Sequence, residues 1–161
     1  MIRKFFEARK LRPFKTCALA LDLRGREIRT CSRTIPEEGV PFDMGMTARV
    51  RSGQFLTSTS SKECIIVDNA DLPKAVRPGD DISFNSGELR AVVLESEHDS
   101  IKVQFKQSGN LRCNSKVFIP GNRLAQLPVL QSSDKNDILA TAVKDKFDYL
   151  IVPHITSVKD I

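Results

Sequence analysis

The chain has 161 residues, a formal charge of +5, 40% apolar residues and 28% charged residues. This composition is typical of a globular protein, and the length allows one ordinary domain or a small domain with parts of another. No apolar run reaches the ~20 residues of a membrane-spanning helix, and the charged N-terminus does not resemble a secretory signal. We therefore expect a cytoplasmic protein with reduced thiols and no membrane contact.

The positive charge is confined to the N-terminal segment. Residues 1–16 hold six basic residues and one acidic residue, so the rest of the chain is neutral overall. A nucleic-acid-binding face would need basic residues spread over the folded body, so we expect no nucleic-acid partner. Apolar residues at helical spacing predict that this segment begins with a solvated amphipathic helix, and the alternative is a mitochondrial transit segment.

Metal binding through cysteine or histidine is not indicated. The four cysteines lack the paired spacing of a zinc site, and each of the two histidines stands alone. Cys17 lies in an apolar stretch, so we expect a buried, inert thiol there. The positions concerned are Cys17, Cys31, Cys64, Cys113, His98 and His154.

The first predicted strand follows the N-terminal helix. Residues 17–21 form a continuous apolar stretch that favours a strand buried on both faces of a parallel sheet, and Asp22 closes it. Barrel and doubly wound enzymes place ligand-binding groups at the carboxyl ends of such strands. Asp22 is therefore a candidate binding residue.

Residues 27–119 have the pattern of an all-β region, in which short strands alternate with turn formers. Turns are expected at residues 52–53, 77–80, 86–87, 98–99 and 108–110, where Gly, Pro, Asn or Asp occur. This spacing suggests a small β-barrel. The predicted strands are Thr47–Arg51, Phe55–Thr59, Cys64–Val67, Asp81–Phe84, Glu88–Glu95, Ile101–Lys106 and Lys116–Ile119.

A helix and a second buried strand end the chain. Residues 132–134 (SSD) are a helix start, apolar residues follow at helical spacing to Phe147, and residues 149–152 (YLIV) form a short apolar strand. Two buried strands joined through a helix form a βαβ unit. Here the β-rich region is inserted into that unit.

Four segments of the chain have the pattern of known family motifs. Residues 18–30 (ALALDLRGREIRT) resemble A-L-D-T-K-G-P-E-I-R-T-G, and residues 71–79 (DLPKAVRPG) resemble N-L-P-K-x-V-x-x-G, both motifs of the pyruvate kinase family. Pro120-Gly121 with Leu127-Pro128 resembles L-P-G…L-P, and residues 134–138 (DKNDI) resemble S-E-K-D-I. The resemblance extends over nearly the entire chain.

The resemblance implies a mixed, mainly β fold. Residues 27–127 would be the β-barrel lid domain, inserted between two adjacent strands of an incomplete TIM (β/α)8 barrel. Those strands are residues 17–22 and 149–153, so residues 1–26 and 128–161 would each be a partial barrel piece.

The resemblance also implies an activity and its site residues. The family transfers phosphate from phosphoenolpyruvate to ADP in glycolysis, with Mg²⁺ and K⁺. Arg29 matches the family's phosphate-contacting arginine, and Asp22 matches its potassium-ligating aspartate. Residues 113–116 (CNSK) align with G-S-K-K-G, which leaves Lys116 near the nucleotide-binding lysine, displaced by about one position.

Several positions depart from the family pattern. Leu23 replaces a threonine ligand of potassium, Arg26 a proline and Cys31 a glycine. Residues 85–87 (NSG) replace D-D-G, and residues 153–157 (PHITS) replace S-F-I-R-K without its two bases. Further family ligands lie before residue 1 and after residue 161 in the family order.

We therefore expect a fragment of a pyruvate kinase paralogue that is inactive alone. One alternative is a non-catalytic binding or regulatory module that pairs with a full-length pyruvate kinase. Another is a small basic β-barrel that binds RNA, although one Tyr and no Trp offer few stacking aromatics.

Overall fold

The computed structural model describes residues 2–31, 35–52, 60–121, 125 and 127–160. They divide into two compact units. We call residues 27–127 the β-rich unit, and residues 1–26 with 128–161 the flanking unit. Among the described residues, no helix is long and apolar enough to cross a membrane.

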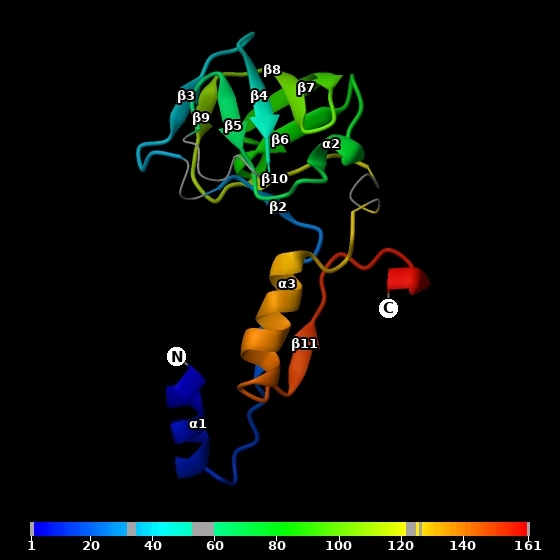
Figure 1. The fold of residues 1–161 in the computed structure, drawn as a ribbon. Coiled ribbons are helices and arrows are strands. Elements are labelled where there is room, and N and C mark those ends of the chain that lie inside the picture. Colours follow the sequence, from blue (N-terminus) through cyan, green and yellow to red (C-terminus); the bar gives the residue numbers. More distant parts are fainter. Residues whose placement is uncertain (1, 32–34, 53–59, 122–124, 126, 161) are drawn as a thin grey trace. The chain divides into compact units, whose positions relative to one another are not determined.

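The β-rich unit is built from short strands (Figure 1). Its one α-helix among the described residues, α2, comprises Leu72–Ala75, and a 3-10 turn at Asn85–Gly87 joins β6 to β7. The strands are β2 (Ile28–Arg29), β3 (Val40–Phe42), β4 (Thr47–Arg51), β5 (Cys64–Ile66), β6 (Asp81–Phe84), β7 (Leu89–Ser96), β8 (Ser100–Phe105), β9 (Gly109–Leu111) and β10 (Lys116–Val117).

The strand pairings of the β-rich unit close into a ring. Five strands form one sheet in the order β5-β4-β8-β7-β6, and β10 pairs antiparallel with β2. A bridge between Ser83 and Phe118 connects β6 to the residue after β10, and a bridge between Thr30 and Val67 connects β2 to β5. The mainly β architecture predicted for this unit is confirmed.

Alternating apolar residues fill the ring. In β8, Ile101, Val103 and Phe105 are almost fully buried, because every second side chain of a strand points to the same face. The rings of Phe42 and Phe84 pack around Phe105, with centroids 4.2 Å and 6.3 Å from it. The hydrophobic core cluster of the described residues lies wholly within the β-rich unit.

The flanking unit contains helices and one parallel strand pair (Figure 1). Strands β1 and β11 pair in register from Ala20 opposite Tyr149 to Asp22 opposite Ile151. Its elements are α1 (Ile2–Leu11), β1 (Ala20–Asp22), α3 (Ser132–Asp137), a π-helical turn (Ile138–Val143), β11 (Tyr149–Ile151) and a 3-10 turn (Val158–Asp160).

One buried carboxylate joins the turn after β1 to the start of α3. Asp134 is 1% exposed and accepts hydrogen bonds from the backbone N–H groups of Arg24 (2.9 Å), Gly25 (3.3 Å) and Gln131 (2.8 Å). The predicted helix start at Ser132 is confirmed. The bond from Gln131 to Asp134 ties the residue before the helix to its first turn.

The two strands of the flanking unit are not buried on both faces, contrary to what the sequence pattern predicted. The side chains of Tyr149, Leu150 and Ile151 are 65%, 45% and 49% exposed, and Cys17 is exposed rather than buried. Each strand has one paired neighbour among the described residues, and a two-stranded pair covers too little apolar surface to bury its own side chains.

The β-rich unit also corrects one expectation. At residues 108–110, where a turn is predicted, Gly109 and Asn110 instead begin β9, which pairs with β3. The sequence pattern missed β3 and β2. The strand predicted over residues 55–59 lies outside the described residues. The other predicted strands are present with ends shifted by at most two residues.

Candidate functional site

The β2–β10 pair brings two candidate site residues together. Lys116 lies directly opposite Arg29, and Val117 opposite Ile28. Ile28 and Val117 are buried in the core, so the alternation of each strand puts Arg29 and Lys116 on the outer face. Two of the three residues proposed from the resemblance therefore form one cluster.

Glu27 holds the two cations of this cluster. Its Oε1 contacts Arg29 Nε, and its Oε2 lies 3.3 Å from Lys116 Nζ. Burial raises the pKa of Glu27, but the charges and hydrogen bonds of Lys116 and Arg29 together lower that pKa below its usual value. The cluster thus combines two positive charges with one negative charge. The sequence could have indicated Glu27, because it lies two residues before Arg29 and side chains at that spacing lie on one face of a strand.

The Arg29 guanidinium is fixed from two sides and open on a third. Nη1 donates to the Asn114 carbonyl at 3.0 Å, while Nε faces Glu27. The backbone of Arg29 is held by Asp68, whose carboxylate accepts from Arg29 N at 2.8 Å. Nη2 has no hydrogen-bond partner among the described residues, and the side chain is 32% exposed. Arg29 is therefore held in place with donors left for a ligand.

The turn at residues 85–87 has a structural function. Asn85, Ser86 and Gly87 all have positive φ angles, of 50°, 59° and 97°. Asn85 Nδ2 donates to the Asn110 carbonyl, and Asn85 Oδ1 accepts from Arg112 N at 3.4 Å. The Asn85 amide thus attaches the β6–β7 turn to β9, and a carboxylate could not donate that first bond.

Asp22 lies in the flanking unit, whereas Arg29 and Lys116 belong to the β-rich unit. It is the exposed last residue of β1, opposite Ile151. Leu23 follows it with a buried side chain, and the Leu23 N–H donates to the Ile151 carbonyl at 3.0 Å. The hydrocarbon side chain of Leu23 offers no ligand atom beside Asp22.

The donors described above do not fit the Mg²⁺ or K⁺ that the resemblance implies. In the described part of the chain, no three His, Cys, Asp or Glu side chains lie close enough to hold a metal ion. Both metals prefer several oxygen ligands, and the amide of Asn85 is already used to fix its turn.

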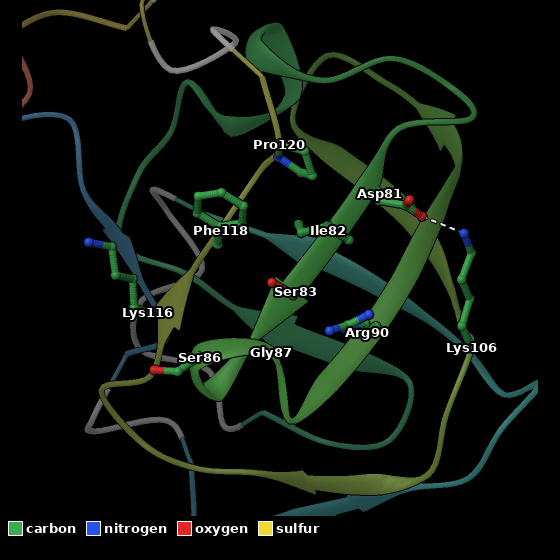
Figure 2. Close-up of a pocket in the computed structure, with 10 residues that line it drawn as sticks. All are labelled: Asp81, Ile82, Ser83, Ser86, Gly87, Arg90, Lys106, Lys116, Phe118 and Pro120. Atoms are coloured by element: carbon green, nitrogen blue, oxygen red, sulfur yellow. Dashed lines mark hydrogen bonds and ion pairs between the residues drawn. The ribbon is translucent and has the colours of Figure 1, made fainter.

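Lys116 and the 85–87 turn also border a cavity of about 620 Å³ in the β-rich unit (Figure 2). The sequence pattern missed most of its lining. Phe118 could have been found, because it follows the buried Val117 and alternation puts its ring outside. The lining residues are Asp81, Ile82, Ser83, Ser86, Gly87, Arg90, Lys106, Lys116, Phe118 and Pro120.

The comparison with known proteins first defines the class of protein. The fold of this chain is similar to that of solved pyruvate kinase structures. The crystal structure of Cryptosporidium parvum pyruvate kinase shares 26% sequence identity, with a TM-score of 0.83 over 99% of this chain and 32% of that one. The same enzyme in complex with ADP gives a TM-score of 0.73.

The family model of the pyruvate kinase barrel domain matches residues 1–161, and the chain belongs to the pyruvate kinase family. Pyruvate kinase of Eimeria tenella is 27% identical over 161 residues, and the cytosolic isozyme of Glycine max is 28% identical over 153 residues. The chain spans 30% and 28% of the length of these two relatives.

Proposed function

We propose that the β-rich unit is the lid domain of a pyruvate kinase and that the flanking unit is part of its (β/α)8 barrel. Two observations support this assignment. The chain divides after residue 26 and before residue 128, and β1 and β11 are parallel neighbours with a helix ahead of β11. In a (β/α)8 barrel, consecutive strands are parallel and a helix separates them.

The reaction we propose for the whole protein is phosphoryl transfer from phosphoenolpyruvate to ADP. In this chain, Arg29 contacts a phosphate and Lys116 contacts the nucleotide. The observation that carries the proposal is the Glu27–Arg29–Lys116 cluster, because it fixes two cations at one point and leaves Arg29 Nη2 open.

These residues contribute position and charge. A guanidinium donates two hydrogen bonds at once to a phosphate, and a lysine ammonium adds a compact charge. Phosphoryl transfer depends mainly on such positioning and charge stabilisation. Glu27 orients both side chains but also offsets one of their two charges. We therefore expect residues 1–161 to bind ADP weakly, with a dissociation constant on the order of 1 mM.

Turnover should not accompany this binding. Leu23 offers no oxygen, Asn85 is engaged in its turn, and residues 156 and 157 carry no charge. Losing several groups that act together removes many powers of ten in rate. A lactate-dehydrogenase-coupled assay with phosphoenolpyruvate, ADP, Mg²⁺ and K⁺ should remain at the rate of the blank. Turnover above that blank would refute this expectation.

Binding itself is tested by calorimetric titration of ADP into the 161-residue chain. Arg29→Ala and Lys116→Ala should each weaken ADP binding at least fivefold, and Arg29→Lys should weaken it less because the charge remains. Arg77→Ala is the matched control, since Arg77 is exposed and its backbone N–H makes the local bond to Asp80. Equal ADP binding in all variants would contradict the assignment of Arg29 and Lys116 to the ADP site.

A further inference from the structure

The cavity of Figure 2 lies over a row of three side chains on adjacent strands. Ser83 and Phe118 exchange two backbone hydrogen bonds of 2.9 Å and 2.8 Å, and Ser83 also lies directly opposite Arg90 in the β6–β7 pair. Side chains that lie opposite one another project from the same face of a sheet. Phe118, Ser83 and Arg90 therefore cross the outer face of the β-rich unit in one line.

This row forms a trough because its middle residue is small. Neighbouring strands lie about 4.8 Å apart, so the backbones of Phe118 and Arg90 are about 10 Å apart with Ser83 between them. The Phe118 side chain is 51% exposed, so its ring offers apolar surface to a ligand in the cavity. A volume of about 620 Å³ suits a small organic molecule.

Two of the three cations that line the trough have a carboxylate partner. Lys106 pairs with Asp81, and Lys116 pairs with Glu27, so each of these cations already has a carboxylate partner. The two lysines stand at opposite ends of the group of labelled residues in Figure 2. The Arg90 side chain, by contrast, has no hydrogen bond or ion pair within the described ranges. Arg90 is therefore the one lining cation without a carboxylate partner in the described part of the chain, whereas Lys116 shares Glu27 with Arg29.

The turn beside Arg90 leaves space for a ligand group. Among the described residues outside its own turn, a Cβ atom placed on Gly87 would meet only Arg90 Nη2, at 4.0 Å. The space between Gly87 and the Arg90 guanidinium is therefore open at one end of the row. A guanidinium in that position binds a carboxylate through two parallel hydrogen bonds.

We propose that this trough is a binding site for a small amphipathic monoanion, in which one aromatic ring is joined by a short chain to a carboxylate. The ring covers Phe118 and Pro120, the chain passes over Ser83, and the carboxylate meets Arg90. A single free guanidinium selects one negative charge, and the spacing of about 10 Å selects the length. Lys116 borders this cavity, so the site adjoins the lysine proposed to contact the nucleotide. Phe118, Ser83 and Arg90 lie outside the Glu27–Arg29–Lys116 cluster and can be tested separately from it.

The probe is 4-phenylbutyrate, measured on the full 161-residue chain by saturation-transfer difference NMR, which observes the ligand whatever the oligomeric state of the protein. We expect saturable binding with the largest transfer to the ring protons. Butyrate lacks the ring and 4-phenyl-1-butanol lacks the charge, so each should bind at least tenfold more weakly.

Three variants test the residues of the row. Arg90→Gln should weaken 4-phenylbutyrate binding at least tenfold but leave 4-phenyl-1-butanol unchanged, because only the carboxylate uses the guanidinium. Phe118→Ala should weaken both ligands about fivefold. Ser83→Leu should block the trough for both ligands. Arg77→Gln removes an exposed arginine outside the cavity and should change neither affinity.

Each contrary result overturns the proposal. Absence of saturable 4-phenylbutyrate binding up to its solubility limit shows that the trough is not such a site. Equal affinity in Arg90→Gln and the unchanged chain shows that the charge does not select the ligand. Equal affinity in Ser83→Leu, with the β-rich circular dichroism spectrum retained, shows that the ligand binds elsewhere.

Discussion

Asn85 shows how one amide determines the shape of a turn beside the candidate site. Its left-handed backbone, with φ of 50°, is a conformation that asparagine tolerates better than most residues. Its side chain also donates to the Asn110 carbonyl. The residue that departs from the family's acidic pattern is thus required by the local structure of this chain.

We predict that Asn85→Asp destabilises the β-rich unit. The substitution replaces the donor Nδ2 with an anionic oxygen that faces the Asn110 carbonyl, and the lost bond costs about 1 kcal/mol or more. Ser86→Asp is the control, because it adds the same charge at an exposed neighbouring position of the same turn. Denaturant unfolding should separate the two variants, and equal midpoints would show that the Asn85 amide is not needed.

The lowered pKa of Glu27 predicts how the stability that the cationic cluster contributes depends on pH. This pKa is lower in the folded chain than in the unfolded chain, so Glu27 binds fewer protons when folded. The stability from this pairing is fully present above the unfolded pKa of about 4.3 and is lost as the pH falls through the lower folded value.

The corresponding measurement is unfolding as a function of pH. Glu27→Gln should reduce stability at pH 7 and flatten the decline in stability below about pH 5. Lys116→Met removes one of the two cations that lower the Glu27 pKa, so an NMR titration should show that pKa moving upward. An unchanged titration in Lys116→Met would mean that Lys116 does not stabilise the Glu27 carboxylate.

At the scale of elements, the alternation of apolar and polar residues in the sequence predicted β8. Its residues Ile101, Val103 and Phe105 alternate with Lys102 and Gln104, and the structure buries the apolar set. A one-sided hydrophobic pattern of this kind is local, so it can be read without knowing the partner strand.

The short strands could not be predicted in this way. Gly109 and Asn110 have the chemistry of a turn, yet β9 pairs with β3, and Asn110 Nδ2 donates to the Glu38 carbonyl at 2.7 Å. Gly39 is also needed, since its φ is 86° and a Cβ there would come within 2.8 Å of the Asn110 side chain. Pairing between distant segments overrides the local preference here.

The same distinction applies to the candidate site. The resemblance alone supplied Arg29 and Lys116, and the cross-strand register shows why they meet. The Glu27 bridge and the row from Phe118 to Arg90 depend on which strands are neighbours. Only the spacing of Glu27 and Arg29 is local, whereas the pairing of Lys116 with Glu27 and of Phe118 with Ser83 joins residues that are far apart in the sequence.

One element of the flanking unit depends on an ion pair. Arg26 is 3% exposed, and its guanidinium donates to both carboxylate oxygens of Asp160, at 2.9 Å and 2.7 Å. It also donates to the His154 carbonyl at 2.8 Å. Asp160 in turn accepts from the N–H groups of Thr156 and Ser157. Arg26 therefore holds residues 154–160 in place.

We predict that Arg26→Ala loosens this segment without unfolding the β-rich unit. Removing the arginine leaves Asp160 without its paired charge and frees the turn that it caps. Amide hydrogen exchange should increase at residues 156–160 but not in β7 or β8. Asp160→Asn, which leaves the buried Arg26 without its counter-charge, should increase exchange in the same residues. Unchanged exchange in Arg26→Ala would contradict the assigned role.

The two units differ in how they distribute apolar side chains over the whole molecule. The β-rich unit buries its own core, whereas the flanking unit leaves large apolar side chains exposed. Exposed strands and apolar faces of this kind promote association. The exposed apolar residues of the flanking unit include Leu139, Val143, Tyr149, Leu150 and Ile151.

We therefore predict that a polypeptide of residues 27–127 is monomeric and β-rich, while the 161-residue chain self-associates or needs a partner chain. Circular dichroism, thermal melting and light scattering on both polypeptides test this. Leu150→Lys should reduce association of the longer polypeptide, because it places a charge in the exposed strand. A monodisperse 161-residue chain that melts cooperatively would contradict the assignment of the flanking unit as part of a barrel.

The strand pairings are nested in the order of synthesis. β1 pairs with β11, and within that interval β2 pairs with β10. On the ribosome, β2 must wait until residues 116–117 have left the exit tunnel, and β1 must wait longer still for residues 149–151. The β2–β10 pair can therefore form while the β1–β11 pair is still incomplete. Nascent chains should become resistant to protease in the β-rich unit before β1 pairs with β11.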